Sequence, residues 1–298
     1  MAFIMANFLI YIFLLFVTLT YHREVITGVT SGLLLWYQTL IPALLPFILI
    51  TNALSETHSY NAVAKRLYKK IPYIYELIAI LLGNLCGYPI GAKIINDFAE
   101  QGYITSDKAN SLLSVSSQAS PMFLLGYVYP MLPGKTIPIY VFFLLIYIPT
   151  LLLSIQQLKN CTNNTIVSSK TSFVKKTSET FIQAVQIMVI IGIYVMIFSI
   201  ILSVLIPKTH SNIVKCMLSF MEITTGLKML QSIHITGKTY ICLILTLSSF
   251  GGLCSAFQIK SVLTSNNCSI KKYLRDKIFL SAGTCILTYI YLNYISIG

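Results

Sequence analysis

The chain has 298 residues, of which 56% are hydrophobic and only 10% are charged, and its mean hydropathy is +0.77. Soluble domains carry about 25% charged residues, so this composition excludes an ordinary soluble protein and indicates a polytopic membrane protein. The apolar runs are about twenty residues long and show no strict alternation, which predicts an all-α membrane fold with about seven to nine hydrophobic segments.

The net charge of +12 comes from 21 basic and 9 acidic residues, and the basic residues gather in short loops between the apolar runs. This positive-inside distribution favours contact with a lipid bilayer over binding of nucleic acid. The seven cysteines form no C-x-x-C pair, and no P-loop, H-E-x-x-H or G-x-S-x-G pattern occurs. We therefore expect no metal, no cofactor and no enzyme activity.

In chain order, the first apolar run covers residues 2–20 and lacks a basic n-region and an A-x-A cleavage site, so we expect a retained transmembrane helix within residues 1–29. A second run covers about 33–54, where Pro42 and Pro46 predict a kink. After a basic loop, the third run, "YIYELIAILLGNLCGYPIGAK" (73–93), is interrupted by glycines and a proline.

A charged, polar stretch follows this break, and Gly102 is expected to end a short helix there. Thr105 or Ser106 should cap the next helix, which continues through a serine-rich turn to Pro121. Another spanning run covers about 137–156, and the lysine-bearing loop 157–179 is the expected cytoplasmic linker.

The second half repeats this order of elements. A run over about 181–206 should span the membrane, a shorter helix over 216–230 should hold Glu222 inside it, and the run 240–260 is again broken. A basic loop with Lys271, Lys272, Arg275 and Lys277 should precede a last span near 278–296.

The positions of the basic loops predict the course of the first broken run. If 73–92 crossed the bilayer, the later crossings would place the basic loop 157–179 outside, against the positive-inside rule. If 73–92 dips in and returns, both basic loops lie inside. The charge pattern therefore favours a re-entrant hairpin. The basic residues from Lys260 to Lys277 oppose an inverted placement of the second broken run, and charge alone leaves that conflict open.

The two broken stretches, "GNLCGYPIGAK" (83–93) and "SSFGGLCSAFQIK" (248–260), occupy matching places on either side of the linker. Paired Gly/Pro-interrupted segments point to two pseudo-repeats, over 30–156 and 180–298, with a transporter-like binding site between them. The alternative is that the small residues only let helices pack closely. A broken helix also frees backbone polar groups, which a ligand, water or neighbouring residue must satisfy.

Polar side chains near the breaks suit a small polar solute, although they could instead bond helix to helix. Glu222 is the clearest ionisable candidate, as a ligand contact, proton carrier or cation ligand, against the alternative of an interfacial residue. Glu76 is expected to be interfacial, and Lys93 and Lys260 to anchor the topology. The candidate residues for the substrate or ion path are Asn84, Gly87, Tyr88, Pro89, Gly91, Ser117, Gln118, Ser120, Pro121, Glu222, Thr225, Gly251, Gly252 and Gln258.

Six motifs together resemble one family: "LIPALLPF" (40–47), "GYPIGAK" (87–93), "DFAEQGYIT" (97–105), "SQASPMFLLG" (117–126), "EITTG" (222–226) and "FGGLCSAFQ" (250–258). As a set they are similar to the sporulation integral membrane protein family YlbJ, whose members carry Gate, or nucleoside-recognition, regions distantly similar to concentrative nucleoside transporters. The residues that match the family pattern are Gly87, Pro89, Gly91, Pro121, Glu222, Gly226, Gly251, Gly252 and Gln258.

The resemblance implies a multi-pass protein of the bacterial cell membrane, in the forespore or mother cell, that is needed for spore formation. One hypothesis is a transporter-like protein that binds a nucleoside-like solute. The other is a non-transporting protein that supports spore envelope assembly through protein partners. An intramembrane enzyme has no nucleophile–base pair in the sequence to support it.

Overall fold

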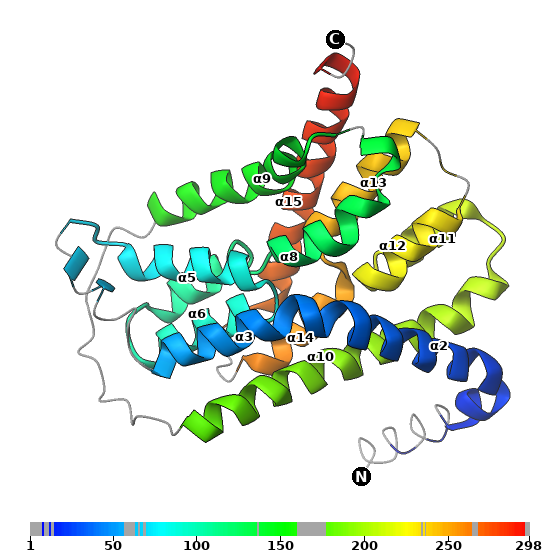
Figure 1. Cartoon of the computed structure of the whole chain (residues 1–298), viewed down its shortest axis with the longest axis horizontal. Coiled ribbons are helices and arrows are strands. Elements are labelled where there is room, and N and C mark those ends of the chain that lie inside the picture. Colours follow the sequence, from blue (N-terminus) through cyan, green and yellow to red (C-terminus); the bar gives the residue numbers. More distant parts are fainter. Residues whose placement is uncertain are drawn as a thin grey trace.

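The described part of the chain is helical in the computed structural model and contains several apolar helices (Figure 1). The structure describes residues 15–56, 70–135, 137–159, 177–233, 237–263 and 268–295, with the separate positions 8, 12, 63, 64, 66, 67 and 235. Within these residues, four helical stretches are long and apolar enough to cross a membrane: His22–Leu54, Ile139–Lys159, Phe181–Lys208 and Gly237–Val262. The shorter α5 (Ile74–Cys86) is also apolar. The predicted multi-pass helical membrane protein is confirmed.

The first of these stretches is built from α2 (His22–Leu35), a π-helical turn η1 (Trp36–Leu40) and α3 (Ile41–Glu56). It begins before the predicted residue 33, and the expected boundary between residues 29 and 30 lies within α2. Pro42 lacks an N–H and so cannot bond the carbonyl one turn earlier, which accounts for a widened turn directly before it. The predicted helix over residues 2–20 lies mostly outside the described residues, of which 15–20 are helical.

Small residues let α2 lie directly along α10 (Thr177–Leu205), as Figure 1 shows. Gly28 and Gly32 form a G-x-x-x-G pair on one face of α2, the spacing that allows two helix backbones to approach. A Cβ added at Gly28 would lie 2.6 Å from the Cα of Ile200. One turn later, the indole N–H of Trp36 donates to the carbonyl of Met188 at 2.8 Å, and its ring covers Gly192.

The first broken run forms α5 and α6 (Ile90–Glu100), which pack against each other on either side of Gly87. Gly102 has φ 74° just after α6, and the Thr105 hydroxyl accepts from the N–H of Lys108 to cap α7 (Ser106–Leu112). Both of these sequence predictions are confirmed. Residues 113–120 then leave the helix and run buried through the protein interior to α8 (Pro121–Phe123).

The remaining elements follow the predicted order with two corrections. They are η2 (Leu124–Val128), η3 (Tyr129–Met131), η4 (Pro133–Lys135), α9 (Ile139–Lys159), α10, η5 (Ile206–Lys208), α11 (Asn212–Ser219), α12 (Ile223–Ser232), α13 (Gly237–Phe250), α14 (Gly252–Val262), α15 (Ile270–Ile290) and η6 (Tyr291–Ile295). The single helix expected over 216–230 is two helices, and Glu222 lies between them. The basic residues 271–277 belong to α15 and not to a loop. Most of the predicted linker, 160–176, lies outside the described residues.

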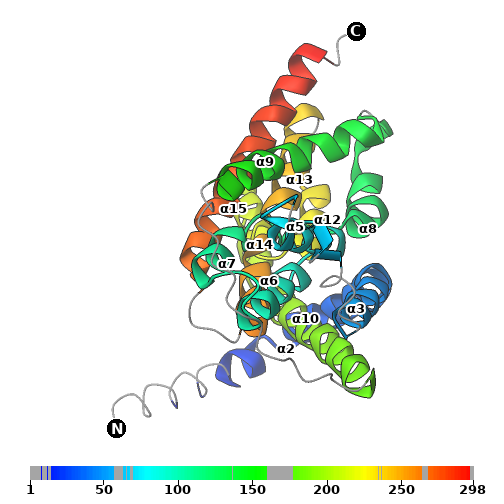
Figure 2. The ribbon, with the colours of Figure 1, turned by 90° about the vertical axis from the view of Figure 1, so that its left-hand side faces the viewer.

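The last helix connects the two halves of the chain. Figure 2 shows α15 rising toward the C-terminus beside α13 and α9, and these helices pack against one another. The large buried apolar cluster draws residues from both halves, including Leu124, Ile146 and Leu247. The halves therefore share one core, and any site between them is held by residues far apart in sequence.

Candidate functional site

The first break is packed onto the buried segment 113–120. Gly83 and Gly91 sit on α5 and α6, and a Cβ added at either would overlap the carbonyl oxygen of Ser116. Glycine at both positions lets the segment pass close to the two helices, which explains why two of the three glycines of "GNLCGYPIGAK" are placed where they are.

Hydrogen bonds then fix the break itself. The N–H of Tyr88 donates to the carbonyl of Gln118 at 3.2 Å, and the Asn84 amide donates to the carbonyl of Val115 at 2.9 Å. Asn84 also donates to its own helix at Ile80, while its buried Oδ1 has no partner among the described residues. These hydrogen bonds at the break are therefore made between protein groups and are not left open for a ligand.

The second break lies at Gly251, whose φ of 86° and ψ of −2° fall in the left-handed region that favours glycine. Beyond it, the N–H groups of Leu253 and Cys254 donate to the carbonyls of Phe220 and Met221 at 3.0 and 2.9 Å. Those carbonyls belong to the connection between α11 and α12. The first N–H groups of α14 are thus already bonded and do not point freely at a ligand.

Glu222 caps the helix that starts in this connection. Its carboxylate accepts from the N–H of Thr224 at 3.0 Å, from the N–H of Thr225 at 2.7 Å and from the Thr224 hydroxyl at 2.7 Å. The residue is 1% exposed and forms no ion pair among the described residues. The carboxylate lies at the N-terminal end of α12 and caps it. Glu222 therefore lies between α11 and α12 and not inside one helix, as the sequence predicted.

The two breaks meet at one small cavity. The ring of Tyr88 lies against Gly251, where an added Cβ would be 3.2 Å from Tyr88 Cε1, and Gly252 packs against Glu222 and the N–H of Ile223. The cavity measures about 20 Å³, which is room for about one water molecule. Its walls are Leu40, Leu44, Gly87, Tyr88, Ala119, Ser120, Phe123, Ile191, Val195, Glu222, Ile223 and Gln258.

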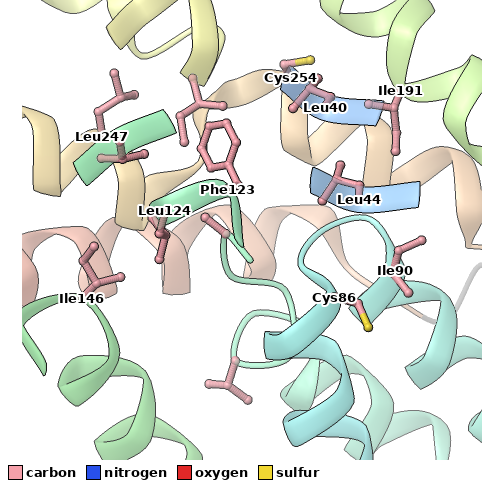
Figure 3. Packing of buried hydrophobic residues seen from close by; sticks show 14 of the residues in the cluster. Leu40, Leu44, Cys86, Ile90, Phe123, Leu124, Ile146, Ile191, Leu247 and Cys254 are labelled. Atoms are coloured by element: carbon pink, nitrogen blue, oxygen red, sulfur yellow. The ribbon is translucent and has the colours of Figure 1, made fainter. Parts of the chain in front are cut away.

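Figure 3 shows the apolar part of this wall. Leu40 and Leu44 come from the first long span, Ile191 from α10, and Phe123 from α8, with Cys86 and Ile90 on the helices that flank the first break. The polar part is a carboxylate, an amide, a phenol and a hydroxyl, and the described lining includes no basic side chain. Such a set can hydrogen-bond hydroxyl and amine groups against an apolar wall.

Five predicted site residues line the cavity: Gly87, Tyr88, Ser120, Glu222 and Gln258. The others are not part of its lining. Pro89 and Pro121 start α6 and α8, Gly91 packs on Ser116, Thr225 bonds Ser199 at 3.0 Å, and Asn84, Ser117 and Gln118 lie on or against the buried segment. Ser120 also accepts from the N–H of Phe123 at 3.2 Å, so its hydroxyl is an ordinary helix cap as well as a wall group.

Two charged groups are buried against protein. Glu76, which the sequence predicts to be interfacial, is 3% exposed and pairs with Lys108 at 2.8 Å in the first turn of α5. Lys277 lies in α15 and is 1% exposed. The sequence does not mark it as buried, because it follows Lys271, Lys272 and Arg275 and together these residues predict a basic loop. Lys93 pairs with Asp97 at 2.8 Å along α6, while Lys260 is exposed.

Comparison with known proteins gives one distant curated relative. No family model matches the chain, and no solved structure matches it. The sporulation integral membrane protein YlbJ of Bacillus subtilis (strain 168) is 23% identical over 123 residues, which cover 40% of this chain and 30% of that protein. The similarity therefore spans less than a third of the relative's length. Over that part the chain is distantly similar to this integral membrane protein, and the four apolar helical stretches agree with a membrane protein.

Proposed function

We propose that this YlbJ-like membrane protein acts in spore formation and binds a small polar, nucleoside-like solute between its two helix breaks. The role in sporulation is carried over from the name of the relative. The solute site is supported by one observation, the convergence of Gly87 and Tyr88 from the first break with Glu222 and Gln258 from the second half on a single cavity. Membrane-depth polar groups gathered at paired helix breaks are typical of solute sites.

The cavity as described is closed to such a solute. Sites for small organic molecules measure about 300–1,000 Å³, far more than the about 20 Å³ found here. Binding would therefore require the two breaks to move apart, with Tyr88 leaving Gly251. Such a movement is typical of transporters that alternate between closed and open forms. The contact between Tyr88 and Gly251 would then belong to the closed form.

The predicted two-repeat organisation belongs to the same proposal. We propose that α5 and α6 form a re-entrant hairpin and that 30–156 and 180–298 are related repeats. The close approach of Gly83 and Gly91 across the break supports the hairpin. Labelling of cysteines placed at Lys93 and Lys260 from either side of the membrane tests it. Labelling of position 93 only from outside contradicts the hairpin.

Uptake or binding by the protein in liposomes tests the function. A panel of nucleosides and small polar metabolites is offered to the wild type, to Glu222→Gln and to Glu24→Gln, whose carboxyl lies in the first turn of α2. Solute-dependent uptake or binding that falls in Glu222→Gln but not in Glu24→Gln supports the proposal. No solute dependence, with Glu222→Gln still supporting sporulation, overturns it.

A second function is a non-transporting membrane protein that supports spore envelope assembly through partners. The small cavity and the fully bonded carboxylate of Glu222 favour it, because both fit a purely structural core. Normal sporulation by every cavity variant that folds, together with no solute dependence, would identify this function.

A further inference from the structure

A buried lysine lies behind the wall of the cavity. Lys277 of α15 is 1% exposed, and its ammonium donates to Gln118 Oε1 at 2.7 Å and to the carbonyl of Ser117 at 3.2 Å. The Gln118 amide is oriented by a second bond, from its Nε2 to the hydroxyl of Thr150 on α9 at 2.7 Å. The cation is thus seated on two oxygens of a buried, non-helical segment from the other half of the chain.

The described residues give this ammonium no carboxylate partner. Asp276, its neighbour, accepts from Ser114 through one oxygen at 3.2 Å and from Arg275 through the other. A cation held only by neutral oxygens has lost water without gaining an opposite charge. Lys277 lies outside the four candidate spans, and burial lowers its pKa from the usual value.

Several other titratable groups on the packed elements bond partners other than Lys277. Tyr147 on α9 donates to Ala119, Tyr240 on α13 donates to Met131, Cys254 on α14 accepts from Gln258, and Tyr273 on α15 bonds Ser255. Farther along α13, Lys238 bonds Asn293 and Cys242 is a free thiol. None of these groups is hydrogen-bonded to Lys277 among the described residues, so its ammonium is held by Gln118 and Ser117.

The segment that Lys277 holds reaches the cavity directly. The carbonyl of Gln118 accepts from the N–H of Tyr88, and the next two residues, Ala119 and Ser120, are cavity wall. A change in the bonds at Gln118 therefore acts on the first break through the bond to Tyr88, and on the cavity wall through the two residues that follow. The hydroxyl of Ser117, whose carbonyl accepts from Lys277, is buried and has no hydrogen-bond partner among the described residues. A neutral amine, unlike an ammonium, has a lone pair that accepts a hydrogen bond from a hydroxyl.

We propose that Lys277 is a proton-binding site that controls the wall of the cavity. With a proton bound, the ammonium holds residues 117–118 in place, so the carbonyl of Gln118 keeps its bond to the N–H of Tyr88 at the first break. Loss of the proton to water leaves a neutral amine with weaker bonds and loosens the wall. The proposal stands without the solute site, since it concerns only the first break.

Two native cysteines serve as reporters of the breaks, because Cys86 ends α5 at 1% exposure and Cys254 lies in α14 at 2% exposure. Alkylation of each thiol in the full-length protein is followed by peptide mass spectrometry between about pH 6 and pH 9, the range in which a buried lysine with a lowered pKa can titrate. The variants are Lys277→Met, Lys277→Arg and the matched control Lys272→Met, whose lysine lies on the same helix and bonds Ser111.

Rates are compared between variants at each pH, which removes the titration of the thiol itself. We expect the Cys86 rate of the wild type to match that of Lys277→Arg at low pH and to rise above it by roughly tenfold at high pH, since the bonds at Gln118 lose their charge. Lys277→Met should be fast throughout, and Lys272→Met should follow the wild type. A wild-type profile parallel to that of Lys277→Arg overturns the proposal.

A second measurement keeps the test decisive if the Lys277 variants fail to fold. Hydrogen exchange in the peptide covering 113–120 of the wild type is corrected for its intrinsic pH dependence. Corrected exchange that rises with pH across the same range supports a proton at Lys277. Corrected exchange that stays constant contradicts it.

Discussion

The ring of Tyr88 lies against Gly251, so the two interrupted helical stretches of the chain touch at their breaks. An added Cβ at Gly251 would be 3.2 Å from Tyr88 Cε1. Tyr88 and Gly251 each lie at a helix break that depends on the local sequence. Where the two breaks touch, Glu222 and Gln258 line the same cavity as Tyr88. The site is thus a property of the tertiary contact and not of either motif alone.

Gly91→Ala should destabilise the protein strongly. The new Cβ would overlap the Ser116 carbonyl, which is held in a buried segment and cannot retreat without breaking bonds at the first break. We expect a loss of about 1–3 kcal/mol, the usual cost of overpacking. Thermal denaturation in detergent measures it. Gly126→Ala is the matched control, because nothing lies within 4 Å of its added Cβ. Equal melting temperatures of the two variants would contradict the close contact between Gly91 and the carbonyl of Ser116.

Gly28→Leu should loosen the first long span from α10. Its side chain would meet the backbone at Ile200, so the helices must separate and the bond from Trp36 to Met188 is lost with them. We expect a lower melting temperature and a cost of about 1–3 kcal/mol. Ser31→Leu, on an exposed face of α2, is the control. A Gly28→Leu protein as stable as this control would contradict the packing.

Two substitutions at Glu222 separate its capping role from its charge. Glu222→Gln keeps an oxygen that can accept from Thr224 and Thr225, whereas Glu222→Ala removes the cap and should cost about 0.5–2 kcal/mol. Thermal denaturation of both variants gives the difference. If Glu222→Ala melts like the wild type, the carboxylate is not the cap of α12.

The buried pair of Glu76 and Lys108 should show strong coupling. Lys108→Met leaves a buried carboxylate unpaired and should cost about 3–5 kcal/mol, while adding Glu76→Gln should recover much of that loss. A double-mutant cycle by denaturation measures the coupling. Additive effects of the two substitutions would indicate that the charges do not interact, as an interfacial Glu76 would predict.

The sequence predicts the membrane class, most apolar helices and both breaks, because these depend on local composition and on residues with special backbone freedom. Gly87 and Gly251 both have positive φ, which is why glycine marks the interruptions. The cap at Thr105 follows from the same local chemistry.

The site itself depends on contacts that no local pattern contains. Apolar residues flank Glu222 on both sides and predict a position inside a helix, but its carboxylate accepts from the next N–H groups and starts α12 there. Lys277 follows other basic residues in the sequence. Only the packing of α15 against the buried segment shows that Lys277 bonds Ser117 and Gln118.

Equilibrium binding of labelled nucleosides and similar polar solutes to the protein in nanodiscs is the decisive measurement for a solute site between the two breaks. Gln258→Leu removes a wall amide, and Gln156→Leu, on an exposed face of α9, is the control. We expect at least one solute to bind saturably to the wild type and to Gln156→Leu, and about tenfold or more weakly to Gln258→Leu, because a buried hydrogen bond is lost. Absence of saturable binding to the wild type, or equal binding by both variants, would contradict a solute site at the meeting of the two breaks.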